Sequence, residues 1–456
     1  MTHDQSSRLP PSVRTLITLA LPMIVSRSTQ VVVGVSDAVM VADLGEGALA
    51  ATTAGALNTF AVLILPMGTT FIVSSFASQL FGKGDLKGAR RFGIYGLFLG
   101  LFTELLCLVS IPFIPWVLGQ LPYAPDVRQL MTTYLQVRLA AGGAAIGIEA
   151  LSNYYGGLGK TSYAMYANIA AMVLNVAGNY LLIKGHFGFP AMGVKGAALA
   201  SAVSTTIAFA GFFVWFLRGG VATRAAGLSW REMGRMLRFG IPSGLNWFFE
   251  FSAFNVFVNV VVAGLGTTSL AALMAVMQIN SVSFMPAFGI ASAGAILVGQ
   301  AIGAEAKQDV GRIVRMTFFT TAAWQGLVSI SYLAVPELLF RPFATDPVNS
   351  QKLIQIGVHM LMLSTIWQLC DSAASTLAEA LRAAGDTAFT LWARTIIAWV
   401  IFVPGSYISV RYFKLGEAAA TLWLAAYLGL LAAVLFFRFR SDAWKELKLV
   451  EPDALA

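Results

Sequence analysis

Three carboxylates stand inside long apolar runs of this sequence, where a charged side chain is costly. Asp37 lies in "VVVGVSDAVMV", Glu250 in "NWFFEFSAFNVF" and Asp371 in "STIWQLCDSAAS". None of them has a basic residue one helical turn away along the chain. An ionised side chain at the centre of a membrane costs at least about 2.5–3.5 kcal/mol. Acids kept at such positions therefore indicate a role in moving ions or substrate.

A carboxylate in a low-dielectric interior lowers its energetic cost by binding a proton or Na⁺. Glu250 and Asp371 fall on the first and fourth predicted helices of the second half of the chain. If those helices meet, the two acids form a site that one cation can neutralise. We interpret Asp37, Glu250 and Asp371 as ion- or proton-coupling residues. The alternative for each acid is a hydrogen bond to nearby backbone or to a hydroxyl group.

The residues around these acids suggest a cavity for a flat, lipophilic cation. Trp367 precedes Asp371 by four residues, and Asn246 precedes Glu250 by four, so each pair shares a helical face. Aromatic faces attract cations, although an aromatic stripe is also typical of simple packing or lipid contact. The remaining substrate-cavity candidates flank Glu250 or lie in the second helix of each half: Phe249, Phe254, Gln278 and Asn58.

The composition indicates that these residues sit in a membrane protein. The chain has 456 residues, of which 57% are hydrophobic and 11% charged, whereas soluble proteins average about 25% charged. Apolar runs near 20 residues predict membrane-spanning helices. The two cysteines, Cys107 and Cys370, fall inside such runs and predict small buried side chains rather than a disulfide. The net charge of +8 comes from short loops, which indicates membrane orientation and not nucleic-acid binding.

Gly, Pro and charged residues divide the apolar runs into twelve predicted transmembrane helices, so the fold class is an all-α polytopic membrane protein. The predicted helices are 14–42, 48–80, 93–116, 128–156, 162–185, 193–217, 236–263, 269–301, 315–340, 352–381, 387–411 and 415–438. With the N-terminus inside, twenty Lys and Arg residues lie in inner segments and seven in outer ones. This asymmetry predicts a multi-pass protein of the cell (inner) membrane with both termini in the cytoplasm.

The two halves of the chain repeat each other. "SQLFGKGDLKGARR" aligns with "GQAIGAEAKQDVGR", "LALPMIV" with "FGIPSGL", and "GLGKTSYAM" with "AAGDTAFTL". The last pair places Gly159 opposite Gly385 and Thr161 opposite Thr387. The offset stays between 220 and 226 residues. Each repeat contains an even number of spans, so the halves share one topology about an axis along the membrane normal.

These repeats predict two pseudo-symmetric six-helix bundles around a central cavity. The predicted domains are a cytoplasmic tail (1–13), an N-lobe (14–217), a cytoplasmic linker (218–235), a C-lobe (236–438) and a second cytoplasmic tail (439–456). Rocking of the lobes about the cavity would give alternating access. Repeats of this kind also suit a channel or a lipid flippase.

The chain resembles the MATE family of multidrug and toxic compound extrusion transporters, and more closely its NorM-type branch. The resemblance covers about Leu16 to Phe437. It rests on "SDAVMVADLG", "FFEFSAF", "GQAIGA", "WQLCDSAASTLAEALRAAGDT" and "GLGKTSYAMYANIAAMVLNVAGNYLL". It implies twelve helices in two lobes and an antiporter that exports organic cations and drugs while Na⁺ or H⁺ enters.

By position, the resemblance implies that Asp37 is the N-lobe acid and that Glu250 and Asp371 form the C-lobe cation pair, with Na⁺ favoured there. It places Asn175 and Asn179 as polar partners of Asp37. Two positions depart from the family pattern. Asn179 replaces an Asp found in some branches, and Trp367 replaces a Tyr whose hydroxyl can assist ion binding.

We therefore expect a monomeric secondary active transporter, with no cofactor apart from the coupling ion, that contacts the lipid bilayer and small organic cations. A flippase for lipid-linked oligosaccharides or lipid precursors is the alternative, and it should line its cavity with Arg and Lys; here the mid-span charge is mainly acidic. An enzyme is disfavoured because no HExxH, paired-Cys or GxSxG motif occurs. A channel is disfavoured by the lack of a pore motif.

Overall fold

The protein is all-helical throughout the part described by the computed structural model, which covers residues 9–219, 227–343 and 350–450. No strand occurs within these ranges. The ends of both predicted tails, seven residues of the predicted linker and residues 344–349 lie outside the described residues.

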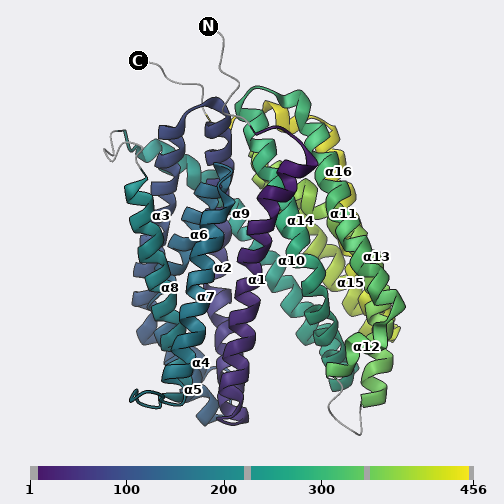
Figure 1. Ribbon diagram of the computed structural model, residues 1–456. Helices are drawn as coiled ribbons and strands as arrows, with labels where there is room; N and C mark the ends of the chain where they lie inside the picture. Colours follow the sequence, from purple (N-terminus) through teal and green to yellow (C-terminus); the bar gives the residue numbers. More distant parts are fainter. Residues whose placement is uncertain (1–8, 220–226, 344–349, 451–456) are drawn as a thin grey trace. The chain divides into compact units, whose positions relative to one another are not determined.

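Eight helices make up the first half of the chain, and Figure 1 shows the long ones running side by side. They are α1 (Val13–Ala42), α2 (Glu46–Lys83), α3 (Leu86–Ser110), α4 (Ile114–Gly119), α5 (Pro125–Leu139), α6 (Gly142–Gly157), α7 (Thr161–Leu182) and α8 (Gly193–Arg218). In this half α2 packs on α3, α5 and α6, while α8 packs on α5, α6 and α7.

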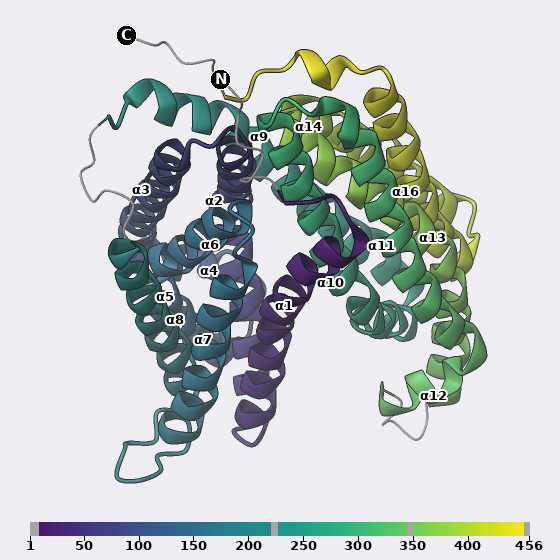
Figure 2. The same cartoon turned by 45° about the horizontal axis from the view of Figure 1, so that its top comes forward.

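The second half follows a similar plan, although not every helix has a counterpart of the same length. They are α9 (Trp230–Val256), α10 (Thr267–Gly303), α11 (Val310–Ala334), α12 (Pro336–Phe340), α13 (Ser350–Ala384), α14 (Thr387–Ile396), α15 (Val403–Tyr407) and α16 (Gly416–Arg440). Here α13 packs against α10, α11 and α16, as the two views of the fold show (Figure 2). The π-helical turns Phe257–Val262 and Ile397–Phe402 extend α9 and α14 into longer rods.

The helices form the predicted twelve membrane segments, six in each half. Ten described helices are long and apolar enough to cross a membrane, and an eleventh joins them if the pair Lys307–Ala334 and Pro336–Phe343, bent by 92°, is one span. The remaining predicted span, 128–156, is broken into α5 and α6 at Ala140 and Ala141. With 15 residues in α5 and 16 in α6, neither piece alone is long enough to cross a membrane.

Proline and glycine positions account for several bends and boundaries. Pro22, Pro66, Pro242 and Pro286 each stand inside a long helix, one in each of the first two helices of both halves. Proline removes an intrahelical hydrogen bond and favours a kink there. At the end of α2, Gly84 adopts φ 84°, a left-handed conformation that glycine reaches without strain.

Contacts group the described residues into two compact units. One combines the described parts of Met1–Ile24 and Leu245–Ala456, and the other is Val25–Gly244. The division therefore falls within α1 and α9, two or three residues after Pro22 and Pro242. These divisions differ from the predicted lobe boundaries at 217 and 236. Residues 13–24 of α1 belong to the unit that contains most helices of the second half, and residues 230–244 of α9 belong to the unit that contains the helices of the first half.

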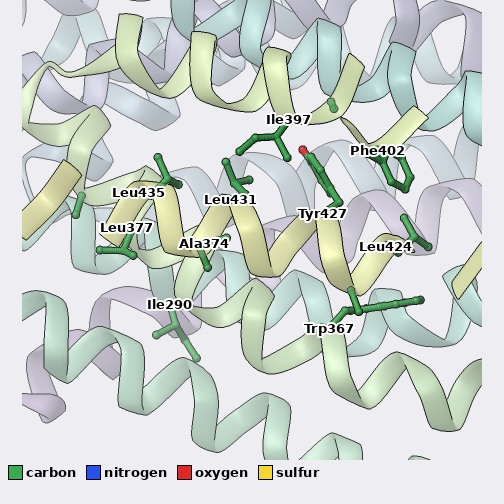
Figure 3. Packing of buried hydrophobic residues seen from close by; sticks show 14 of the residues in the cluster. Ile290, Trp367, Ala374, Leu377, Ile397, Phe402, Leu424, Tyr427, Leu431 and Leu435 are labelled. Atoms are coloured by element: carbon green, nitrogen blue, oxygen red, sulfur yellow. The ribbon is translucent and has the colours of Figure 1, made fainter. Parts of the chain in front are cut away.

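The second unit's core is a continuous apolar layer along α13 and α16. Figure 3 shows Leu424, Leu431 and Leu435 of α16 and Trp367, Ala374 and Leu377 of α13 in one cluster of buried hydrophobic residues. Burial of a Leu or Phe side chain contributes roughly 1.5–3 kcal/mol. This layer holds α13 and α16 in a fixed relation, and both helices carry groups of the acidic site described below.

Candidate functional site

Asp37 belongs to a closed ring of hydrogen bonds built by α1, α7 and α8. Asn179 donates from Nδ2 to Asp37 Oδ1 at 2.5 Å and to Asn175 Oδ1 at 3.2 Å. Asn175 donates to Ser201 Oγ at 2.8 Å, and Ser201 donates to Asp37 Oδ2 at 3.4 Å. All four side chains are buried. The structure thus brings the three sequence-derived residues together and adds Ser201.

The ring leaves one oxygen available for a small ligand. The Oδ1 atom of Asn179 is buried and has no hydrogen-bond partner among the described residues. Buried polar atoms are normally satisfied by protein or water. Asp37 also interacts Coulombically with Arg138 of α5, so a basic residue acts on its charge. A carboxylate, an open amide oxygen and a hydroxyl are oxygen ligands for a proton, Na⁺ or water.

An exposed ion pair joins the ends of the two helices that carry Asp37 and Asn179. Lys184, after α7, lies 2.5 Å from Asp43 Oδ2, after α1. The hydrogen bond and charge of Lys184 hold the pKa of the Asp43 carboxyl below its ordinary value. Since solvent screens exposed pairs, this contact contributes little to stability. Any contribution is present above the ordinary carboxyl pKa and is lost as pH falls through the lowered one.

We predict that Asn179→Ala destabilises the protein by about 1–3 kcal/mol, because Asp37 loses its main donor in a buried place. Thermal unfolding of the purified protein measures the change. The matched control is Asn259→Ala, since Asn259 is an exposed asparagine of the other unit; its effect should stay within about 0.5 kcal/mol. Equal effects of the two substitutions would show that the ring does not stabilise the fold.

Glu250 does not stand alone among aromatic residues. Arg394 of α14 donates to Glu250 Oε2, and the pair is largely shielded from solvent, with 13% of the arginine and 28% of the acid side chain exposed. Tyr427 of α16 donates to Glu250 Oε1 at 3.4 Å. Glu250 therefore has a basic partner, although no basic residue lies one helical turn away along the chain. Arg394 lies 144 residues away in sequence, where helical spacing gives no sign of it.

Asp371 is held by neutral donors instead. Gln325 of α11 donates to Asp371 Oδ2 at 2.9 Å, and Ser375 donates to Oδ1 at 3.2 Å. Ser372 in turn donates to Gln325 Oε1 and fixes the orientation of its amide. Glu250 and Arg394 both act Coulombically on Asp371. Glu250 and Asp371 are thus electrostatically linked, and the guanidinium of Arg394 acts on both acids.

The charges of this acidic site decide what it can bind. Glu250 and Asp371 carry two negative charges when ionised, and Arg394 carries one positive charge at every accessible pH. With both acids ionised, the site therefore has a net charge of −1. One proton or one monovalent cation completes it. No group of three or more His, Cys, Asp or Glu residues suited to a metal ion occurs among the described residues, so Na⁺ would also need amide, hydroxyl or water oxygens.

A second polar network on α13 was missed by sequence reasoning. Gln368 accepts hydrogen bonds from Ser283 at 3.0 Å and Ser329 at 2.9 Å and donates to Asn280 Oδ1 at 3.1 Å. It lies three residues before Asp371, so the polar face of α13 continues past the acid. The available signal was "QLCDSAAS", where polar residues recur at helical spacing in an apolar run.

The substrate-cavity candidates fall in different surroundings. Trp367 is buried in the apolar layer of Figure 3, and Phe254 packs against the same cluster. Gln278 is exposed, and Phe249 is half-buried, its carbonyl oxygen accepting from Trp399 Nε1 at 3.2 Å. Two further candidates are half-buried: Asn246, whose Oδ1 has no partner among the described residues, and Asn58, which contacts Met131 Sδ at 3.4 Å.

Other charged residues in the helices form local pairs. Glu379 and Arg382, both in α13, form an ion pair at 2.5 Å. Arg27 forms two hydrogen bonds to Glu149 of α6, at 3.0 and 3.2 Å, within the Val25–Gly244 unit. Glu104 accepts from Gly143 N at 2.5 Å. These contacts give each acid a structural partner.

Twelve apolar membrane segments in two repeats, with partly compensated acids inside them, define a polytopic membrane transporter. A family profile described as MatE matches residues 22–181 and 242–408. The chain belongs to the MatE family. This membership makes the chain a transporter and not an enzyme.

Full-length relatives give the same assignment. The chain is 28% identical over 398 residues to the "Probable multidrug resistance protein NorM" of Chromobacterium violaceum, covering 85% of this chain and 84% of that protein. It is 26% identical over 433 residues to the protein of the same name from Thermotoga maritima, covering 94% and 91%. These relatives mark it as a NorM-type member.

Solved structures share the fold. A MOP superfamily transporter from Pyrococcus furiosus matches with a TM-score of 0.88 and 20% identity, covering 98% of this chain and 99% of that one. A MATE protein in complex with MaL6 matches with the same score and identity, covering 98% and 100%. At this identity the likeness establishes the twelve-helix architecture alone.

Proposed function

We propose that this protein is a cation-coupled antiporter that exports small organic cations by alternating access, driven by inward movement of Na⁺ or H⁺. The acidic site of Glu250, Asp371 and Arg394 carries this proposal. Its net charge of −1 with both acids ionised is unfavourable in a membrane interior. Binding of one monovalent cation removes that charge and so couples conformation to an ion gradient.

The relatives' printed names support the class of substrate. They are called multidrug resistance proteins, and half-buried aromatic and amide side chains near Glu250, such as Phe249 and Asn246, suit lipophilic cations. A flippase for anionic lipid precursors would need excess basic charge at its binding site. The acidic site has the opposite balance, which favours export of cations.

The test is efflux of a fluorescent organic cation from vesicles containing the purified protein, with a Na⁺ gradient and a pH gradient imposed separately. We expect one gradient to drive export and the other to have no effect. Protein-free vesicles are the control. No response to either gradient would overturn ion coupling, and transport of an anionic lipid analogue but no cation would favour the flippase.

A further inference from the structure

A pocket of about 260 Å³ lies in the Val25–Gly244 unit, among the ends of α3, α6, α7 and α8, and its lining includes none of the residues of the ring around Asp37. Its lining includes three cationic side chains, Arg90, Lys160 and Arg218, and no acidic residue. Aromatic rings complete it, among them Tyr155, Tyr163 and Trp215. By the Lys and Arg count, this end of the unit is the predicted cytoplasmic one.

The deepest cation of the pocket has no carboxylate partner. Arg90 is only 7% exposed, donates to the carbonyl oxygen of Phe216 at 2.9 Å and lies 4.3 Å from the centre of the Phe216 ring. No ion pair to Arg90, Lys160 or Arg218 occurs among the described residues. A buried charge without a counter-charge is costly. Binding of an anion that is not part of the protein would therefore stabilise Arg90 in this pocket.

The first turn of α7 adds to the positive potential. Lys160 is the N-cap residue, and its side chain caps no amide. The first amides of a helix have no intrahelical acceptor, and the helix dipole places partial positive charge there. Phosphate groups bind readily at such a terminus. Lys160 and Tyr163 place this turn in the pocket wall.

The equivalent place in the other repeat is neutralised internally. The alignment that pairs Gly159 with Gly385 places Asp386 where Lys160 stands, and an offset of 220 residues places Arg438 where Arg218 stands. Arg438 pairs with Asp386 at 2.7 Å and lies over the Phe389 ring at 4.7 Å. The second repeat thus has a carboxylate, Asp386, beside Arg438. The first repeat has a cation, Lys160, at the equivalent position.

We propose that this basic pocket binds the phosphate of an anionic phospholipid headgroup from the predicted cytoplasmic leaflet. Basic pockets between membrane helices bind such headgroups. Trp215 at the pocket is 52% exposed, and its ring lies 5.5 Å from that of Tyr163. Trp and Tyr concentrate where helices meet the headgroup region, so the pocket mouth suits a lipid rather than a soluble anion.

The experiment measures lipid binding to the full-length protein in neutral detergent by native mass spectrometry. Phosphatidylglycerol is the anionic probe, phosphatidylcholine the net-neutral lipid, and inorganic phosphate the soluble anion. The informative variant is Lys160→Asp, because it recreates the Asp386–Arg438 arrangement opposite Arg218. We expect phosphatidylglycerol to bind at least about tenfold more weakly to this variant and thermal stability to be unchanged or higher.

The matched control is Lys87→Asp, which makes the same charge change at an exposed position of α3 on the same predicted face and outside the pocket lining. Its lipid affinity should stay within about twofold of wild type. Equal losses in both variants, or no loss in Lys160→Asp, would overturn the site. Binding of inorganic phosphate alone with the same dependence on Lys160 would overturn the lipid source. If Lys160→Asp does not fold, Arg218→Gln takes its place with the same expected loss.

Discussion

We expect that replacing Asp371 with Asn will remove most ion-coupled efflux while the protein stays folded. Asn retains the shape of the side chain and can still accept from Ser375, so we expect a stability change of only about 1 kcal/mol. It cannot take up a proton, and it has no charge to attract Na⁺. The rate of gradient-driven efflux should fall at least about tenfold, within the usual range of coupling between two ligand sites.

Reconstituted vesicles with an imposed Na⁺ or pH gradient measure this effect. Glu337→Gln is the control, because Glu337 is an exposed acid at the start of α12 and its loss should leave efflux unchanged. Asp371→Glu keeps an ionisable group and should retain part of the rate. Wild-type efflux by Asp371→Asn under both gradients would exclude Asp371 from coupling.

The second large effect concerns the charge balance set by Arg394. Glu250→Gln leaves Arg394 without its carboxylate, so the guanidinium, which already acts Coulombically on Asp371, compensates the remaining acid. The site becomes neutral without a coupling ion, and coupled efflux should be lost. Adding Arg394→Met restores the net charge of −1 through Asp371 alone. We therefore expect the double variant to recover coupled efflux that Glu250→Gln lacks.

Arg394→Met alone should be the least stable of the set. It leaves two acids near each other without a fixed cation, and breaking a buried ion pair costs about 3–5 kcal/mol. Thermal unfolding of the two single variants and the double variant gives the pair's coupling energy. If the double variant is as stable as wild type but still does not transport, Glu250 itself must bind the ion and the charge-balance mechanism is wrong.

The predicted helices agree closely with the observed ones because apolar length and helix-breaking residues are local properties. The predicted span 193–217 is α8, Gly193–Arg218, and 387–411 ends within one residue of the helical rod that begins with α14. The internal repeat was also visible, since "GLGKTSYAM" and "AAGDTAFTL" each mark a turn before a helix. The break between α5 and α6 was not predicted, although Arg138 and the pair Gly142 and Gly143 flank it.

The sequence alone determined which acids lie within membrane helices, because a carboxylate in an apolar run is evident from residue type and spacing. Only the tertiary structure decided what faces each one. Arg394 is 144 residues from Glu250, Gln325 is 46 from Asp371, and Asn179 is 142 from Asp37. Such partners meet through the packing of separate helices, and helical periodicity carries no information about pairs so far apart. The acids were therefore predictable, while the net charge of their sites was decided by the fold.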